Sequence, residues 1–159
     1  CGGPKGDSVS KVLVVCTGNI CRSPMAEGML RERLSGTSWT VDSAGVHAMV
    51  DYPPEPLAIE MAATFAADIH ALRARQISTE DFYRFAMMIA MDHGNYDYLS
   101  AVLPADSDVV INMWTDANGN IVEVPDPYQR PRRFYRRVAQ LIDTGLESLQ
   151  HQLLGATGA

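Results

Sequence analysis

Cysteine and histidine are scarce in this chain, and their spacing argues against two classes of protein. Only three of the 159 residues are cysteine, and Cys16 and Cys21 lie five positions apart. Three cysteines cannot all pair, and this spacing is unlike a disulfide framework, so we expect a reducing, cytoplasmic setting. The histidines are scattered, without a close partner at metal-ligand spacing: His47, His70, His93 and His151. We therefore expect no metal site and no cofactor.

The sequence also lacks a long apolar run and an excess of positive charge. No run approaches the ~20 apolar residues that a membrane-spanning helix needs, so we expect no insertion into a membrane. Residues 1–10 lack the apolar core of a secretion signal; we expect a flexible leader or a cloning remnant there, with no structural role for Cys1. The net charge of −6 argues against nucleic acid as a partner. We expect the chain to act as a monomer.

The residues that are present fit one domain over residues 11–155, because 47% are hydrophobic and can form a sizeable core. Apolar segments predict four strands, at residues 12–15, 39–44, 86–90 and 109–113. Helical patterns cover residues 24–34 and 57–66, start near Ser78 and Asp92, and fill the last long segment. There a core-facing stripe is expected at Phe134, Val138, Leu141, Ile142, Leu149 and Leu153. Strands alternating with helices predict an α/β fold, a three-layer sandwich around a central four-stranded parallel sheet.

The most informative stretch joins the first predicted strand to the first predicted helix. It reads Cys16-Thr17-Gly18-Asn19-Ile20-Cys21-Arg22-Ser23, with five residues between Cys16 and Arg22. A loop of this length can wrap one tetrahedral anion, with its N–H groups inward and the positive end of the next helix beside it. Ser23 is the predicted N-cap of that helix. Because ligands bind at the carboxyl ends of parallel strands, we predict a phosphate-binding loop after the first strand.

The residue types in this loop favour phosphoryl transfer. The helix end and Arg22 both favour the thiolate form of Cys16, which can attack phosphorus and form phosphocysteine. Arg22 presents a planar fork of donors that matches two phosphoryl oxygens. Gly18 allows close approach of the backbone, Asn19 tolerates unusual backbone angles, and Ser23 can donate a hydrogen bond to the sulfur. An isolated Cys-x5-Arg pattern often arises by chance, so the strand before it and the helix after it give the pattern its weight.

A second segment, Val124-Pro125-Asp126-Pro127-Tyr128, supplies a candidate proton donor. Departure of a phenolate or alkoxide is helped by a proton donor, which contributes about 10²–10⁴-fold. Prolines on both sides of Asp126 stiffen the backbone that carries its carboxyl group. The same carboxylate could then activate the water that hydrolyses phosphocysteine. Asp-Pro alone is typical of a turn, but beside the cysteine loop it predicts a general acid/base.

Together, the two motifs resemble those of the low-molecular-weight protein tyrosine phosphatases. The resemblance covers about residues 11–154 and includes the segments Asp42-Ser43-Ala44-Gly45, Arg73-Ala74-Arg75-Gln76, Glu80-Asp81-Phe82 and Ala90-Met91-Asp92. It implies hydrolysis of phosphotyrosine in a partner protein, with Cys16 as nucleophile, Arg22 as transition-state clamp and Asp126 as general acid/base.

The resemblance also implies roles for the residues around these three. Asn19 and Ser43 would brace the loop through hydrogen bonds, Asp92 would support the loop region, and Tyr128 would form one wall of the cleft. The implied substrate-binding residues are Thr17, Gly18, Asn19, Ile20, Cys21, Ser23 and Tyr128. The other wall is expected from residues 47–52.

Cys21 has two interpretations. It resembles the second loop cysteine with which many members of the family form a reversible disulfide that protects the nucleophile from overoxidation. Alternatively, it only packs beneath the loop. Two positions depart from the family pattern: Gln129 follows Tyr128 where a second aromatic residue is common, and Leu72 stands where some members have histidine.

Five clustered arginines follow Asp126 closely: Arg130, Arg132, Arg133, Arg136 and Arg137. They could attract an acidic phosphopeptide, or form a solvated helix face opposite the core stripe at Phe134 and Val138. We favour the solvated face.

Three other functions are open to a cysteine loop of this kind. An arsenate reductase needs further cysteines downstream, and none follows Cys21. A phosphocysteine carrier has little use for Arg22 and Asp126 together, and a non-catalytic phosphotyrosine-binding module does not need the intact set of Cys16, Arg22 and Asp126. We therefore predict a protein tyrosine phosphatase.

Overall fold

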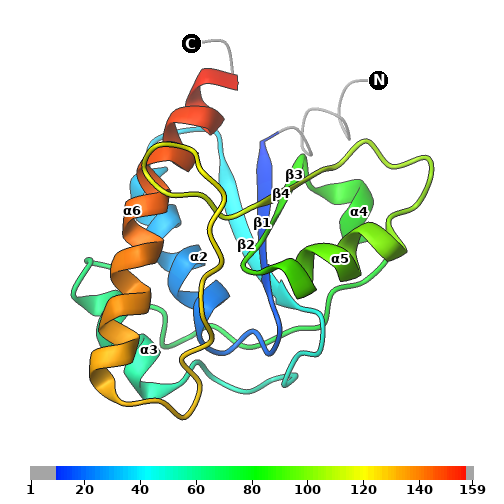
Figure 1. Ribbon diagram of the computed structural model, residues 1–159. Coiled ribbons are helices and arrows are strands. Elements are labelled where there is room, and N and C mark those ends of the chain that lie inside the picture. Colours follow the sequence, from blue (N-terminus) through cyan, green and yellow to red (C-terminus); the bar gives the residue numbers. More distant parts are fainter. Residues whose placement is uncertain (1–9, 157–159) are drawn as a thin grey trace.

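A parallel sheet of four strands forms the centre of the molecule, in a computed structural model that describes residues 10–156 (Figure 1). The strands are β1 (Lys11–Cys16), β2 (Thr40–Gly45), β3 (Met87–Ala90) and β4 (Val110–Met113). They lie in the order β2-β1-β3-β4, and every neighbouring pair is parallel. Each strand lies within about a residue of the segment predicted for it. The predicted leader lies outside the described residues except for Ser10.

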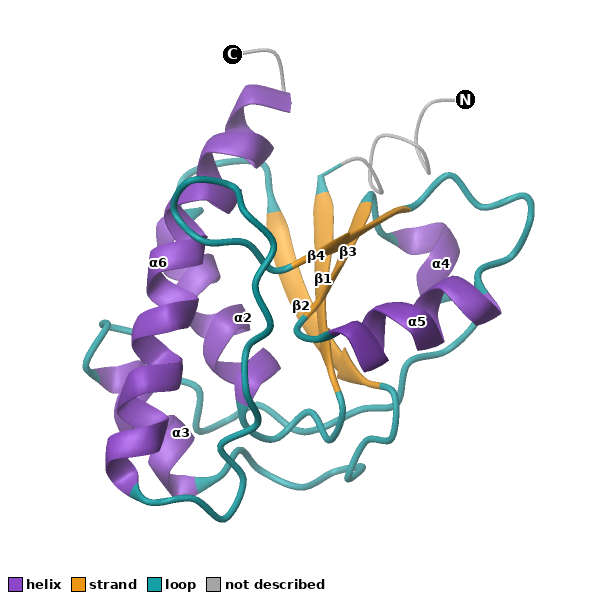
Figure 2. Ribbon diagram, viewed as in Figure 1, coloured by secondary structure: helices purple, strands orange, loops and turns teal. Residues whose placement is uncertain are grey.

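Helices cover both faces of the sheet, which confirms the predicted three-layer α/β sandwich (Figure 2). One layer holds α2 (Arg22–Arg33), α3 (Pro56–Ala63) and α6 (Arg132–Ala156), and the other holds α4 (Asp81–Arg84) and α5 (His93–Val102). None of the helices within residues 10–156 has both the length and the apolar character needed to cross a membrane.

The alternation of side chains along β1 divides the core in two. Val12, Val14 and Cys16 face the cluster with α2, α3 and α6, whereas Leu13 and Val15 face the smaller cluster with α4 and α5. Because successive strand residues point to opposite faces, the continuous apolar run in β1 is what a strand covered on both faces requires.

The long helix α6 presents the predicted apolar stripe, with two adjustments. Val138, Ile142, Leu149 and Leu153 are buried as expected, but Phe134 and Leu141 are only partly buried. Tyr135 and Leu146, which the predicted stripe omits, are fully buried. Positions 135, 138, 142, 146, 149 and 153 follow steps of three and four, so the true stripe is the regular one.

Three predicted helix boundaries were wrong. The helix predicted at residues 57–66 ends at Ala63, and Ala66 adopts a left-handed φ of 66° that a helix does not allow. The helix predicted to start near Ser78 begins at Asp81 and is only the short α4, and Asp81 accepts a hydrogen bond from the Ser78 N–H at 2.8 Å. The first helix begins at Arg22, two residues earlier than predicted.

Candidate active site

The loop from Cys16 to Arg22 connects the carboxyl end of β1 to the first residue of α2. It lies at the carboxyl edge of the sheet, where parallel sheets bind ligands. Its residues line a cleft of about 200 Å³, together with His47, Met49, Asp126 and Tyr128. Both Cys16 and Arg22 are almost fully buried, at 2% and 3% exposure. The cleft therefore presents a sulfur and a guanidinium group at its base.

The carbonyl groups of the loop are bonded outward, to the segment that follows β2. The carbonyls of Cys16, Thr17, Gly18 and Ile20 accept hydrogen bonds from the N–H groups of residues 46, 47, 49 and 55, at 2.8–3.0 Å. Carbonyl groups held outward leave loop N–H groups free to face the cleft, as an anion cradle needs. No side chain caps the first turn of α2, so the positive end of this helix also faces the loop.

The closest packing of backbone against backbone in this region occurs at Gly45. A Cβ atom on Gly45 would lie 2.5 Å from the Thr17 carbonyl oxygen, whereas one on Gly18 would meet only side-chain atoms at 3.6 Å or more. Within the protein, Gly18 is therefore not required by packing. Gly45 is, because any side chain there would push the loop away from β2.

Two hydrogen-bonding groups lie next to the Cys16 sulfur. The backbone N–H of Asn19 donates to Sγ at 3.3 Å, and Ser23 Oγ lies 2.9 Å from it. Asn19 has a left-handed φ of 62°, which asparagine tolerates better than most residues, as the sequence suggested. Ser23 was predicted as an N-cap, and this was wrong: its hydroxyl group turns toward the sulfur and no side chain caps α2.

The hydrogen bonds around Asn19 determine which way the Ser23 hydroxyl points. The Arg75 backbone N–H donates to Asn19 Oδ1 at 2.9 Å, so the Asn19 amide nitrogen is the donor on its other side. That nitrogen donates to Ser23 Oγ at 2.8 Å and to Ser43 Oγ at 2.9 Å. Because Ser23 already accepts this bond, its own proton is available to the sulfur. The arrangement suits a thiolate, which can only accept.

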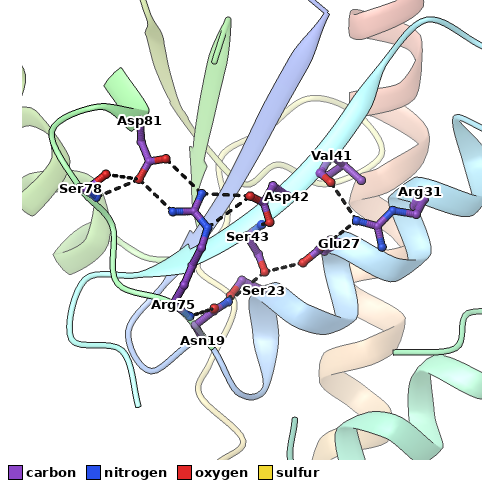
Figure 3. Close-up of polar contacts among 10 residues, drawn as sticks. All are labelled: Asn19, Ser23, Glu27, Arg31, Val41, Asp42, Ser43, Arg75, Ser78 and Asp81. Atoms are coloured by element: carbon purple, nitrogen blue, oxygen red, sulfur yellow. Dashed lines mark hydrogen bonds and ion pairs between the residues drawn. The ribbon is translucent and has the colours of Figure 1, made fainter. Parts of the chain in front are cut away.

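A buried carboxyl group closes this network on the side of α2. Ser43 donates a hydrogen bond to Glu27 Oε1 at 2.6 Å (Figure 3). Glu27 also forms an ion pair with Arg31, and Arg31 donates a hydrogen bond to the Val41 carbonyl at 2.9 Å. Burial raises the pKa of Glu27, although the bonds from Ser43 and Arg31 oppose that effect. Glu27 thus ties the loop support to β2 and to α2.

Arg75 connects the loop to the opposite helical layer. Its guanidinium group lies between Asp42 at 3.0 Å and the fully buried Asp81 at 3.1 Å, while its backbone N–H holds Asn19 (Figure 3). Burial alone would lower the pKa of Arg75, but these two carboxylates raise it on balance. The guanidinium group is therefore a fixed cation, and it keeps the loop in place without lining the cleft.

The Arg22 guanidinium group is held from three sides. Its Nη1 donates to Asp92 Oδ2 at 2.8 Å and to the Val124 carbonyl at 2.9 Å. Its Nη2 lies 3.4 Å from Thr17 Oγ1 and 4.0 Å from Asp126 Oδ2. Burial would lower the pKa of Arg22, but Cys16 and Asp92 more than offset it. The Nη1 group of the guanidinium therefore holds the side chain in place, and Nη2 faces the cleft.

Asn95 contacts two of the residues that hold Arg22, namely Thr17 and Asp92. It is 2% exposed, its Nδ2 donates to Thr17 Oγ1 at 3.2 Å, and its N–H donates to Asp92 Oδ1 at 2.8 Å. The second of these bonds makes Asp92 the N-cap of α5, where the sequence predicted a helix start. Thus Asp92 joins α5 to Arg22 through its two oxygens.

The segment with Asp126 and Tyr128 forms the open wall of the cleft. Asp126 is exposed, and its Oδ1 accepts a hydrogen bond from the Tyr128 N–H at 3.1 Å. Val124 anchors the segment, since its N–H donates to the Met91 carbonyl at 2.8 Å and its carbonyl accepts from Arg22. His47 and Met49 line the other wall, within the segment predicted for it.

Cys21 lies beneath the loop and contacts α6. Its Sγ is 3.4 Å from the hydroxyl group of the buried Tyr135. Burial raises the pKa of Cys21 to about 12, although the bond to Tyr135 opposes this. At neutral pH Cys21 is therefore a neutral thiol in the core, which agrees with the packing interpretation.

A family comparison matches this architecture over nearly the whole chain. The description of low molecular weight phosphotyrosine protein phosphatases fits residues 11–157. The chain belongs to this family. It is 31% identical over 136 residues to the low molecular weight protein-tyrosine-phosphatase Etp of Escherichia coli K12, covering 84% of this chain and 88% of Etp.

Solved structures of related phosphatases share the fold. A low molecular weight phosphotyrosine phosphatase of Vibrio cholerae aligns with a TM-score of 0.85 and 33% identity, over 94% of this chain and 99% of that one. Wzb of Vibrio vulnificus in complex with benzylphosphonate aligns with a TM-score of 0.82 and 26% identity, over 91% and 99% of the two chains. Family membership makes this chain a protein tyrosine phosphatase.

The predicted site residues of this phosphatase come together at one end of its sheet. Those that line the cleft are Cys16, Thr17, Gly18, Asn19, Ile20, Cys21, Arg22, Asp126 and Tyr128. Ser23, Ser43 and Asp92 lie behind them and contact Cys16, Asn19 and Arg22. Four further residues contact the site without having been predicted from the sequence: Glu27, Arg75, Asn95 and Tyr135. Only Arg75 had a signal, because it belongs to a segment that matches the family.

Proposed function

We propose that this phosphatase hydrolyses phosphotyrosine and small aryl phosphates through a phosphocysteine intermediate, without metal. The observation that carries the proposal is that the Cys16 sulfur and the Arg22 guanidinium, at the two ends of one loop, line the same cleft as the Asp126 carboxylate from a segment far along the chain. The catalytic domain would be residues 11–155, with a phosphotyrosine-containing protein as substrate.

In the first step the Cys16 thiolate attacks phosphorus, so that an S–P bond forms as the P–O bond to the tyrosine breaks. Arg22 Nη2 and the inward N–H groups of the loop bind the phosphoryl oxygens. Asp126 donates its proton to the departing phenolate.

In the second step water attacks the phosphocysteine, and Asp126 takes a proton from that water. The S–P bond breaks, inorganic phosphate is released, and sulfur leaves as a thiolate. The hydrogen bonds from Ser23 and from the Asn19 N–H support this departure, because a charge-assisted bond is stronger than a neutral one.

Aromatic substrates fit the walls of the cleft. Ile20, Met49 and Tyr128 contribute apolar surface to its lining, which suits the phenyl ring of an aryl phosphate. The related Vibrio vulnificus Wzb is known in complex with benzylphosphonate, a phosphonate that carries an aromatic ring.

Turnover of p-nitrophenyl phosphate in the presence of EDTA tests this proposal. Cys16→Ser should abolish turnover and keep affinity for phosphate, since the loop and Arg22 remain. Asp126→Ala should lower kcat by about 10²–10³-fold, because a proton donor is lost. Equal turnover by Cys16→Ser and the wild type would exclude Cys16 as nucleophile, and a near-normal rate in Asp126→Ala would assign the proton to another group.

A further inference from the structure

The start of α6 carries a concentration of positive charge that contrasts with the rest of the molecule. We call its five members the arginine strip: Arg130, Arg132, Arg133, Arg136 and Arg137. All five are exposed, and no acidic residue lies between positions 130 and 137. The whole chain has a net charge of −6, so the strip is a local exception on an acidic protein.

The strip is continuous with the wall of the catalytic cleft. Tyr128 lines the cleft, Gln129 turns the chain with a left-handed φ of 62°, and the Arg130 N–H donates to the Pro127 carbonyl at 2.9 Å. The Arg130 guanidinium carbon lies 4.3 Å from the centre of the Phe134 ring. In Figure 1 the N-terminal end of α6 lies at the same end of the molecule as the loop after β1. A substrate leaving the cleft past Tyr128 therefore meets the strip.

Most of the strip forms no ion pair within the described part of the chain. Arg132 pairs with Glu60 at 2.7 Å. In residues 10–156 no ion pair joins a carboxylate to Arg130, Arg133, Arg136 or Arg137. Arg130 stacks on Phe134, and Arg136 helps to lower the pKa of Glu60. The charges of Arg133 and Arg137 are the least engaged within the described residues and can meet an external anion.

The position of the strip does not favour the stability of α6. The N-terminal end of a helix has a positive partial charge and is stabilised by acidic side chains, but the first turn of α6 has none. Arginines there repel the helix end and one another. The dipole of α6 therefore does not stabilise these arginines at this end of the helix.

We infer that the arginine strip binds acidic residues that flank the phosphotyrosine of the substrate, and so makes an acidic phosphoprotein segment the preferred substrate. The inference rests on the proposed function of the cleft. Residues 132–137 rise by about 8 Å along the helix, the length of about two extended peptide residues. A short acidic run matches this length. A long polyanion would extend from the strip over the acidic remainder of the protein.

Two phosphotyrosine peptides test the inference, one with three glutamates on each side of the phosphotyrosine and one with glutamines in their place. The readout is kcat/KM for the glutamate peptide divided by kcat/KM for the glutamine peptide. Any general loss of activity cancels in this ratio. For the wild type we expect a ratio of about 10 at low salt, because complementary charge raises the rate of encounter. It should approach 1 in about 0.5 M NaCl, where surface charges are screened.

The variant Arg133→Gln/Arg136→Gln/Arg137→Gln should bring the low-salt ratio below about 3. The matched control is Thr144→Glu/His151→Glu/Gln152→Glu, which lowers the net charge equally at exposed positions farther along α6 and should keep the wild-type ratio. A wild-type ratio of 1, an unchanged ratio in the arginine variant, or an equal fall in the control would each overturn the inference.

Two further outcomes concern the activity of the cleft and the kind of anion that the strip binds. If neither peptide is hydrolysed, the proposed function fails, and calorimetric binding of both peptides to Cys16→Ser provides the same comparison for the strip. If the strip instead retains duplex DNA or anionic vesicles at about 0.15 M salt while the peptide ratio stays at 1, the inference is overturned.

Discussion

The single buried carboxyl group of Glu27 has the clearest effect at the scale of one residue. It receives a hydrogen bond from Ser43, which in turn accepts one from Asn19 in the loop. An acidic side chain in this position orients Ser43, because only an acceptor there makes the Ser43 hydroxyl donate toward α2. The cost is that a charge must be buried.

This cost predicts a pH dependence of stability. Burial raises the pKa of Glu27, so above the ordinary value of 4.5 the folded chain binds more protons at this site than the unfolded chain. The contribution of Glu27 to the free energy of unfolding is then largest below 4.5 and falls as the pH rises through the raised pKa. Glu27→Gln removes this fall. Between pH 4 and 7, the free energy of unfolding of the variant, measured with urea, should therefore rise relative to that of the wild type.

Glu60→Gln is the control for this experiment. The hydrogen bond and ion pair with Arg132 lower the pKa of the exposed Glu60, so its contribution is present above 4.5 and is lost as the pH falls. As the pH rises, the free energy of unfolding of the wild type should therefore increase slightly relative to that of Glu60→Gln. This trend is opposite to the one expected for Glu27→Gln. The same trend in both variants would contradict the assignment to Glu27.

Cys21 allows a second prediction at this scale. Cys16 and Cys21 are equally buried and both line the cleft, but the pKa of Cys21 is raised to about 12, so its thiol should resist iodoacetamide at pH 7.5 while Cys16 should react. Inorganic phosphate should protect Cys16. Mass spectrometry of the digested protein would show this, and rapid modification of Cys21 in the folded protein would favour the disulfide interpretation.

At the scale of elements, the contact of α6 with the end of β4 is unusually close. A Cβ atom on Gly145 would lie 2.2 Å from the Thr115 carbonyl oxygen and 2.3 Å from Trp114 Nε1. Trp114 is 2% exposed and its Nε1 has no hydrogen-bond partner in the described residues. The helix therefore lies against the indole ring and the backbone with no room for a methyl group.

Gly145→Ala should destabilise the protein by about 1–3 kcal/mol, because backbone atoms cannot move aside as a side chain can. Gly155→Ala lies on the same helix with nothing within 4 Å of the new atom, and should change stability by less than about 0.5 kcal/mol. Urea unfolding of both variants measures the difference. Similar values would show that α6 can move away from Trp114.

At the scale of the whole molecule, the site depends on segments from both sides of the sheet. Arg22 belongs to α2, Asp92 precedes α5 on the other side, and Asp126 lies in the segment between β4 and α6. Arg22 joins all three through contacts to Asp92, Val124 and Asp126. An anion in the loop should therefore stabilise the whole fold.

Inorganic phosphate at about 100 times its dissociation constant should stabilise the protein by about 2.7 kcal/mol. For a chain of this size that corresponds to a rise in Tm of roughly 5–10 °C. Arg22→Lys should reduce the rise because a lysine cannot bind two oxygens in the same geometry. Asp126→Asn should not reduce it. Thermal unfolding at constant ionic strength measures these shifts, and an equal rise in Arg22→Lys would exclude the role of the guanidinium fork.

The sequence by itself determined the α/β class, the four strands and the residues that line the cleft. These follow from local patterns: apolar runs of strand length, helix starts such as Asp92, and a loop between Cys16 and Arg22 at the end of a strand. The parallel arrangement then places the ends of the strands together at one edge. Asp126 could also be recognised, because its prolines and its neighbour Tyr128 form a motif.

Only the tertiary structure decided how the loop is held and which way its side chains point. The sequence left two roles open to Ser23, helix N-cap and donor to the sulfur. The bond from Asn19, which the distant Arg75 positions, leaves the Ser23 proton for the sulfur. Glu27 and Asn95 act through partners far away in the sequence. Such contacts depend on how helices pack on the sheet, and no local propensity records them, since the bonding partners become neighbours only when the chain has folded.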